Sequence, residues 1–446
     1  MASNGVCGMV LAASRKKLVV AASREPLNGN QIRGFWAAWG GWALDGMDSF
    51  IYALVMVPAL RELLPRSGIP DTPANEGLYG GLLFALFLVG WGMAFLWGPL
   101  ADRFGRVRTL MLTIAWYSLF TFLGAIATRV WQLAAFRLLA GIGIGGEWAM
   151  GGTFVAEEWP ESRRKMGAGL MHTGYYFGFF LAALLNYIVG TKYGWRAMFA
   201  VGGAPALLIG FIRYGVTEPN RWVNKVEQIK SWSVTRSFFM LFSPTYRRRT
   251  ILNCLYVLVS IVGLWAGVVY VPSAVISLAS RAGLSPVEAA RLSSYATMLL
   301  SLGTIFGCIV LPAFAERLGR RATLALYFAV MLVFIPLAFG YAFYLPTHAL
   351  SAFITCLPFL GFGGANFAMY TLWLPEQYPT ECRASAFALA ISIGRFVGAG
   401  ITFLVGAGVS HFHSIGIPVA LTSVAFVLGL ALLPFGEETT GKPLPA

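Results

Sequence analysis

Two carboxylates, Asp45 and Asp48, lie in the middle of an apolar stretch that covers residues 39–60. At about 1.5 Å per residue, a helix of this length crosses a bilayer core of roughly 30 Å, so both acids would lie near the midplane. A charge there costs at least about 2.5 kcal/mol unless it has a partner, a polar cavity or a bound proton. The alternative is a buried structural polar pair.

The spacing of Asp45 and Asp48 places both on one face of a helix, a turn apart. Two carboxylates so close in a medium of low dielectric resist double ionisation, so the pair can hold a proton at physiological pH. We therefore expect one of them to take a proton from outside and release it to the cytoplasm, which would drive uptake.

Arg395 lies within another apolar stretch, in the sequence ISIGRFVGAG, where small neighbours would let a ligand approach its guanidinium. This group is always charged and presents a fork that matches a carboxylate, so Arg395 is the candidate for binding an anionic substrate. The alternative is a permanent ion pair with one of the intramembrane acids.

Arg137, Glu147 and His172 are the other ionisable residues in apolar stretches. Arg137 and Glu147 are ten residues apart, about 15 Å along a helix, so they cannot pair directly. Glu147 is either a second proton-coupling carboxylate or a gating charge held by loop arginines at the cytoplasmic mouth. His172 is either a proton relay or a packing residue.

The composition is that of an integral membrane protein, with 57% hydrophobic and 12% charged residues. The net charge of +14 comes from short basic clusters between apolar runs, which indicates orientation in a lipid bilayer and not nucleic-acid binding. The five cysteines show no CxxC and no histidine at metal spacing. We expect no metal, no cofactor and no enzymatic activity.

Twelve stretches are long enough to span a membrane, in two groups of six: 35–60, 78–101, 109–127, 131–155, 167–189 and 197–216, then 251–279, 291–315, 322–343, 349–374, 384–409 and 416–436. The expected fold is therefore all-α, with two six-helix bundles. The parts are a tail (1–34), an N-terminal bundle (35–216), an interdomain loop (217–250), a C-terminal bundle (251–436) and a second tail (437–446).

The distribution of Lys and Arg sets the predicted orientation. If both termini are cytoplasmic, 24 of the 33 basic residues lie inside, seven lie outside and two lie within spans. We therefore expect a multi-pass protein of a cell inner (plasma) membrane, with both tails and the interdomain loop in the cytoplasm.

The two groups of spans are internal repeats. The segment GPLADRFGR at 98–106 returns as PAFAERLGR at 312–320, and EEWP at 157–160 returns as EQYP at 376–379. These matches, offset by 214 and 219 residues, fall in corresponding loops and indicate a gene duplication.

GPLADRFGR at 98–106, between the second and third spans, resembles the signature loop of the major facilitator superfamily. Arg137 with Gly141, Gly143 and Gly145 is similar to its fourth-helix pattern. The resemblance covers about residues 35–442 and implies two bundles that rock around a central site by alternating access.

Within that superfamily, Asp45-Gly46-Met47-Asp48 resembles the D-G-x-D motif of proton-coupled aromatic-acid symporters and of sialate/monocarboxylate symporters. The segments at 145–164 and 194–213 look most like the second group. The glutamine-rich helices with which sugar porters hold hydroxyls are absent from the fifth and seventh spans, so a sugar substrate is disfavoured.

The resemblance implies a role for Arg137 in proton coupling or in helix packing. It also implies a cytoplasmic gate, for which the candidates are Asp102, Arg103, Arg106, Glu147, Glu316 and Arg320. Side chains that could line a central cavity with hydroxyl, amide or aromatic groups are Tyr52, Tyr175, Tyr176, Asn366, Tyr370 and Trp373.

The sequence therefore predicts a proton-coupled importer of a small organic anion, such as a monocarboxylate or aromatic acid, with a monomer as the functional unit. One alternative is an exporter, or an importer of a neutral or zwitterionic solute. A more remote alternative is a transporter-derived sensor.

Overall fold

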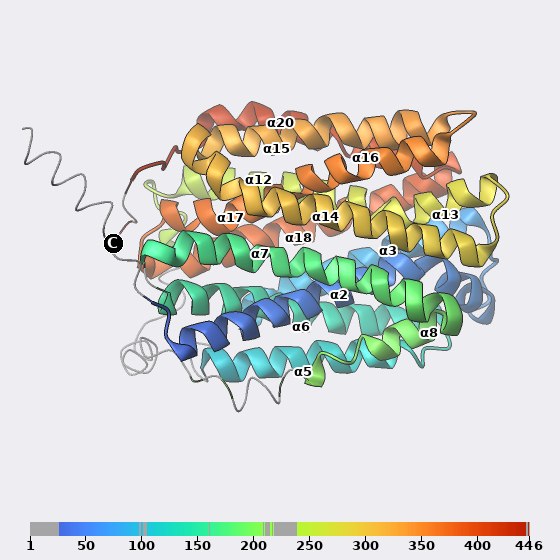
Figure 1. Cartoon of the computed structure of the whole chain (residues 1–446), viewed down its shortest axis with the longest axis horizontal. Helices are drawn as coiled ribbons and strands as arrows, with labels where there is room; N and C mark the ends of the chain where they lie inside the picture. The colour runs from blue at the N-terminus through green and yellow to red at the C-terminus, as the bar shows by residue number, and fades with distance from the viewer. Residues whose placement is uncertain are drawn as a thin grey trace, which may run out of the picture.

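The computed structural model describes residues 26–97, 100, 105–159, 161–207, 209, 215, 217, 239–442 and 445. These residues form helices and connecting turns, with no strand among them. The helices lie side by side along one long axis (Figure 1). In the described part of the chain, ten helical segments are long and apolar enough to cross a membrane. The predicted all-α membrane fold is confirmed, while the count of twelve and the cytoplasmic placement of both termini remain predictions.

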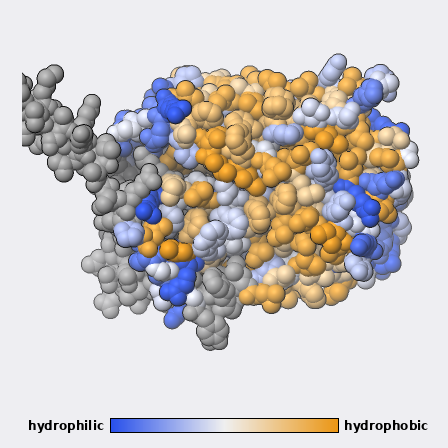
Figure 2. All heavy atoms as spheres, viewed as in Figure 1, coloured by the Kyte–Doolittle hydropathy of each residue, from blue (hydrophilic) through white to orange (hydrophobic). Residues whose placement is uncertain are grey.

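The surface agrees with a membrane setting. In Figure 2 hydrophobic residues cover the middle of the visible face, and hydrophilic residues gather toward its two ends. Large apolar side chains such as Leu119, Phe306 and Val424 are more than half exposed. Exposed apolar surface of this extent is unfavourable in water and is expected where lipid surrounds the protein.

The N-terminal half consists of α2 (Gly29–Arg66), α3 (Pro73–Gly92), η1 (Met93–Leu96), α5 (Arg106–Gly124), α6 (Val130–Glu158), α7 (Glu161–Leu185), η2 (Asn186–Gly190) and α8 (Thr191–Val201). Asn28 caps α2 in a capping box with Gln31, and Thr72 caps α3 ahead of Pro73. Gly194 has φ 78°, a conformation that glycine adopts at little cost, and it breaks the helical path inside α8.

The C-terminal half begins with α12 (Arg247–Ile261), η3 (Val262–Gly267), η4 (Val268–Tyr270), α13 (Val271–Arg281), α14 (Pro286–Leu318) and α15 (Arg320–Ile335). It continues with η5 (Pro336–Tyr341), η6 (Ala342–Tyr344), α16 (Ala349–Gly364), η7 (Ala365–Phe367), α17 (Ala368–Trp373), η8 (Pro375–Gln377), α18 (Thr380–Phe412), α19 (Gly416–Leu421), α20 (Val424–Leu432) and η9 (Leu433–Phe435).

The repeated sequence motif has a repeated backbone conformation. Gly105 precedes α5 with φ 107° and ψ 155°, and Gly319 precedes α15 with φ 89° and ψ 169°. The positive φ at both positions favours glycine. The two glycines occupy matching places in the motifs at 98–106 and 312–320, so the turn geometry agrees with the duplication inferred from sequence.

The two halves meet along α3 with α18 and along α7 with α14. Gly81 of α3 and Gly406 of α18 come together backbone to backbone, since a Cβ on either would lie 2.7 Å from the other's Cα. The Asn186 amide donates to Ser294 Oγ at 2.9 Å, and the Tyr176 hydroxyl donates to the Gly364 carbonyl at 3.1 Å. The intramembrane charges lie on three helices: Asp45 and Asp48 on α2, Arg137 and Glu147 on α6, and Arg395 on α18.

Candidate transport site

Helix α2 carries the two predicted acids into the interior, where Asp45 and Asp48 are fully buried. Gly46 of α2 lies against the Tyr175 carbonyl, and Gly178 of α7 lies against the Ala43 carbonyl. A side chain at either glycine would overlap these carbonyls, so the glycines allow α2 and α7 to pack at close range. This packing fixes the face of α2 that carries the carboxylates.

Asp48 has a cationic partner on α6. Arg137 Nη1 lies 3.8 Å from Asp48 Oδ2, and both side chains are buried. The Arg137 guanidinium also lies over the ring of Phe87, at 4.2 Å, and over that of Tyr52, at 5.4 Å. The structure thus brings together two predicted proton-coupling residues, Asp48 and Arg137, as a buried ion pair.

Asp45 has different surroundings. It lies close enough to Glu147, Asp48 and Arg395 for their charges to act on it. Neither of its carboxylate oxygens has a hydrogen-bond partner among the described residues. A buried carboxylate without a hydrogen-bond donor is costly as an anion.

Glu147 of α6 is buried against α2, not at a protein surface. Its carboxylate lies at Gly41, one turn before Asp45, where any Cβ would overlap it. Tyr117 of α5 lies beside it and is fully buried. Both roles left open by the sequence, a second proton-coupling carboxylate and a gating charge, remain predictions.

Arg395 of α18 comes to this cluster from the other half of the chain and is buried. Its guanidinium lies over the Trp91 ring, 4.0 Å from the centroid. Trp91 in turn contacts Trp265, with ring centroids 5.5 Å apart, and Tyr175, at 6.1 Å. A fixed guanidinium beside aromatic faces can bind the carboxylate of a flat organic acid.

Sequence reasoning did not single out Trp91 or Tyr117. Both lie in apolar helices among other aromatic residues, where no pattern separates a residue beside a charge from one packed against lipid. The contacts with Arg395 and Glu147 arise only when α3 packs against α18 and α5 packs against α6.

The predicted lining residues divide into two sets. The Tyr52 and Tyr175 rings adjoin Arg137 and Trp91 at the charged cluster. The other four donate hydrogen bonds to backbone carbonyls of the C-terminal half: Tyr176 to Gly364, Asn366 to Gly363, Tyr370 to Tyr256 and Trp373 to Glu437.

His172 of α7 is buried between aromatic rings, with Trp42, Tyr176 and Phe367 centroids about 6 Å away. Its Nδ1 lies 3.2 Å from the Thr371 hydroxyl of α17, in the opposite half. This contact joins the halves and favours packing, the second of the two roles considered for His172.

A family model described as the Major Facilitator Superfamily matches residues 38–403. The chain belongs to this superfamily. It is therefore a multi-pass membrane transporter and not an enzyme, as its sequence predicted. The family also explains why the charged cluster lies where two similar halves meet.

The relatives of this chain include two transporters whose names give a substrate. The chain is 31% identical over 424 residues to a probable 4-methylmuconolactone transporter of Cupriavidus pinatubonensis, covering 92% of this chain and 91% of the relative. It is 26% identical over 420 residues to a sialic acid transporter of Escherichia coli, covering 94% and 96%. The second match confirms the suspected resemblance to sialate transporters.

The fold also matches a solved superfamily structure, that of the Escherichia coli xylose transporter in a partially occluded inward-open conformation. The TM-score is 0.75 at 18% identity, and the match covers 94% of this chain and 100% of that one. This similarity confirms the fold.

Apart from Glu147, the predicted gate residues whose side chains the structure describes lie in the C-terminal half. Arg320 is buried and forms a two-pronged ion pair with Glu376, at 2.8 and 2.9 Å. Its contact with Glu316 is longer, at 3.4 Å. Asp102 and Arg103 lie outside the described residues, as does the side chain of Arg106. The gating role of these residues remains a prediction.

Proposed function

We propose that this transporter imports small organic anions, monocarboxylates or aromatic acids, together with protons by alternating access. The observation that carries the proposal is the position of Asp45. Its carboxylate lies within electrostatic range of two acids, Glu147 and Asp48, and of Arg395 from the opposite half. The Asp45 carboxylate thus belongs to the proposed proton site and also lies beside Arg395, the proposed anion site.

Proton binding and anion binding are coupled because Asp45 and the substrate carboxylate compete for Arg395. When Asp45 is ionised, its charge satisfies the guanidinium and opposes a second anion. When a proton neutralises Asp45, Arg395 can bind the carboxylate of the substrate instead. Release to the inside follows when the proton leaves and Asp45 again interacts with Arg395.

Charge balance suggests the stoichiometry. In the described part of the chain, the charges buried in the intramembrane cluster are three acids (Asp45, Asp48 and Glu147) and two bases (Arg137 and Arg395), with His172 counted as neutral. One proton shared by Asp45 and Glu147 makes the empty site neutral. A bound anion adds one negative charge, which a second proton balances. We therefore expect one proton per anion and electroneutral transport.

The substrate class draws support from the relatives, whose names specify 4-methylmuconolactone and sialic acid. The ring contacts of Trp91 beside Arg395 favour a flat or aromatic acid, since such a ligand can replace ring–ring contacts while its carboxylate takes the guanidinium.

Uptake into proteoliposomes tests the proposal. The panel contains lactate, benzoate, hydroxybenzoate and sialate, with glucose and betaine as neutral and zwitterionic controls. We expect at least one acid to accumulate only when the outside is acidic. An imposed potential without a pH gradient should not drive accumulation. Accumulation of no acid, or accumulation that ignores the pH gradient, would overturn the function; binding without movement would indicate a sensor.

A further inference from the structure

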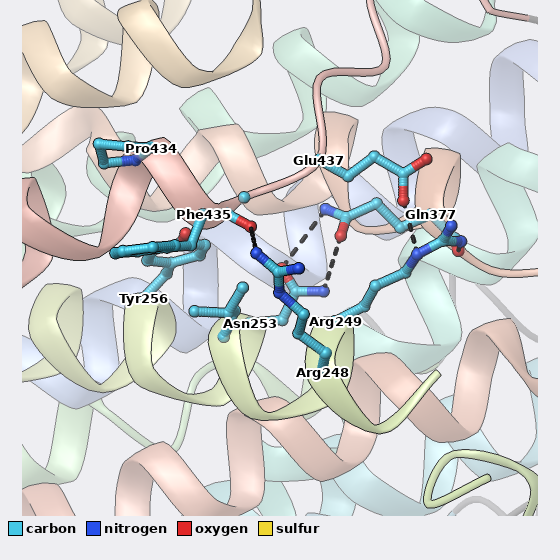
Figure 3. Close-up of a pocket in the computed structure, with 10 residues that line it drawn as sticks. Arg248, Arg249, Asn253, Tyr256, Gln377, Pro434, Phe435 and Glu437 are labelled. Carbon is cyan, nitrogen blue, oxygen red and sulfur yellow. Dashed lines mark hydrogen bonds and ion pairs between the residues drawn. The ribbon is translucent and has the colours of Figure 1, made fainter. Parts of the chain in front are cut away.

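A cavity of about 340 Å³ lies at the start of α12, and none of the intramembrane charges lines it (Figure 3). Three segments form it: the first turns of α12, the residue Gln377 of η8 and the chain that leaves η9. Its lining residues are Arg248, Arg249, Leu252, Asn253, Tyr256, Gln377, Pro434, Phe435, Gly436 and Glu437.

Two adjacent arginines give one side of the cavity a positive charge, but only one of them is neutralised. Arg249 Nε pairs with Glu437 Oε2 at 2.5 Å, and its Nη1 donates to the Gln377 carbonyl at 3.2 Å. Arg248 is exposed and donates to the Phe435 carbonyl at 3.4 Å. No carboxylate of the described chain lies within 4.0 Å of Arg248, so its guanidinium can form an ion pair with a bound anion.

The opposite side is apolar and continues onto the hydrophobic surface. Leu252, Pro434 and the ring of Phe435 line the cavity, and Phe435 is 57% exposed. Ile251, next to Leu252 on α12, is 55% exposed. A ligand in this cavity would therefore touch a cation at one end and the lipid-facing surface at the other, the arrangement of an interfacial amphiphile.

The floor and back wall are held in place by side-chain contacts. Asn253 Nδ2 donates to Gln377 Oε1 at 3.0 Å and to the Tyr378 hydroxyl at 3.1 Å. The Tyr256 hydroxyl donates to the Leu432 carbonyl at 2.8 Å, and its ring stacks on Trp373. Because these side chains are already held in place, a ligand that binds here would not lose free energy in ordering them.

We propose that this cavity binds the phosphate of an anionic phospholipid, with Arg248 as the main contact and the acyl chains along Phe435 and Ile251. Basic pockets between membrane helices bind such headgroups. The lipid would join the first turn of α12 to the segment that follows the last helix, and would so stabilise the C-terminal half. Free phosphate shares the headgroup chemistry but makes no use of the apolar rim.

The test uses the full-length protein in detergent, with lipid retention measured by native mass spectrometry. We expect phosphatidylglycerol to be retained about fivefold more than phosphatidylcholine, the effect of one basic residue near a headgroup. Arg248→Gln should abolish that preference. The matched control is Arg247→Gln, which removes the neighbouring exposed charge, does not line the cavity and should keep the preference.

Thermal unfolding with phosphatidylglycerol or with inorganic phosphate distinguishes a phospholipid site from a free-phosphate site. Phosphatidylglycerol should raise the melting temperature of the wild type and of Arg247→Gln, and inorganic phosphate should not. Equal retention of both lipids by the wild type would overturn the proposal. An equal loss of preference in both variants would indicate general charge attraction and overturn it as well, and stabilisation by phosphate alone would assign a free-phosphate site instead.

Discussion

Gly41 of α2 makes room for the carboxylate of Glu147 on α6, because a Cβ at this glycine would overlap Glu147 Oε1. The contact places Glu147 one helical turn from Asp45, close enough for their charges to interact. In the proposed mechanism, α2 and α6 thus contribute one acid each to a shared proton site.

A methyl group at position 41 should disrupt this site. We expect Gly41→Ala to lower proton-driven uptake at least about tenfold, because Glu147 must move away from Asp45. The free energy of unfolding should fall by only about 1–3 kcal/mol, the usual effect of overpacking. Uptake is measured in proteoliposomes and folding by thermal unfolding. The matched control is Gly400→Ala on α18, where a Cβ meets nothing within 4 Å. Normal uptake by Gly41→Ala would contradict the shared site.

Removing both acids of the shared site separates anion binding from proton coupling. The double variant Asp45→Asn/Glu147→Gln removes the acid that competes for Arg395 and its neighbouring acid, so it should bind the anion without taking up a proton. We expect exchange of labelled for unlabelled substrate to persist while pH-driven accumulation falls at least about tenfold.

Two single variants, Asp45→Asn and Glu147→Gln, provide the comparison. Glu147→Gln keeps Asp45 within electrostatic range of Arg395 and should retain some pH-driven accumulation, whereas Asp45→Asn removes the acid that competes for Arg395 and should lose most of it. If the double variant still accumulates substrate against a gradient, the proton site lies elsewhere, and Asp48 with Arg137 becomes the candidate.

The sequence predicted the fold and the list of buried charges, but not their pairing. Apolar length, repeated motifs and basic loops identify a duplicated membrane bundle because each is a local pattern. The ion pair of Asp48 with Arg137 and the approach of Glu147 to Gly41 depend on how α2 and α6 are rotated about their axes. That rotation is set by close packing among many side chains, which no single stretch records.

The guanidinium of Arg395 should dominate anion affinity. We expect Arg395→Ala to weaken substrate binding about 100-fold, since it removes roughly 3 kcal/mol of charge-assisted hydrogen bonding. Arg395→Lys, which keeps the charge but loses the planar fork, should lose about tenfold. Equilibrium binding of a labelled acid measures both. Unchanged affinity in Arg395→Ala would assign this arginine to structure, as the partner of Asp45.

Glu438 offers a test outside the membrane spans. Burial alone would raise the pKa of Glu438, but hydrogen bonds from the Thr440 hydroxyl and from the backbone N–H groups of Arg320 and Arg321 lower it from the ordinary 4.5 to about 2. A carboxylate with a depressed pKa stabilises the fold fully above its unfolded pKa, near 4.5, and loses this contribution as the pH falls toward 2.

The substitution Glu438→Gln should therefore destabilise the protein at pH 7 and matter progressively less below pH 4.5. We expect a loss of about 1–2 kcal/mol at neutral pH, since the side chain is one-third exposed and solvent weakens its interactions. Thermal unfolding in detergent at pH 7 and pH 3 measures the difference. Asp71→Asn, at an exposed position beyond α2, is the control. An equal loss at both pH values would mean that Glu438 acts through packing, because only an ionised carboxylate contributes in a pH-dependent way.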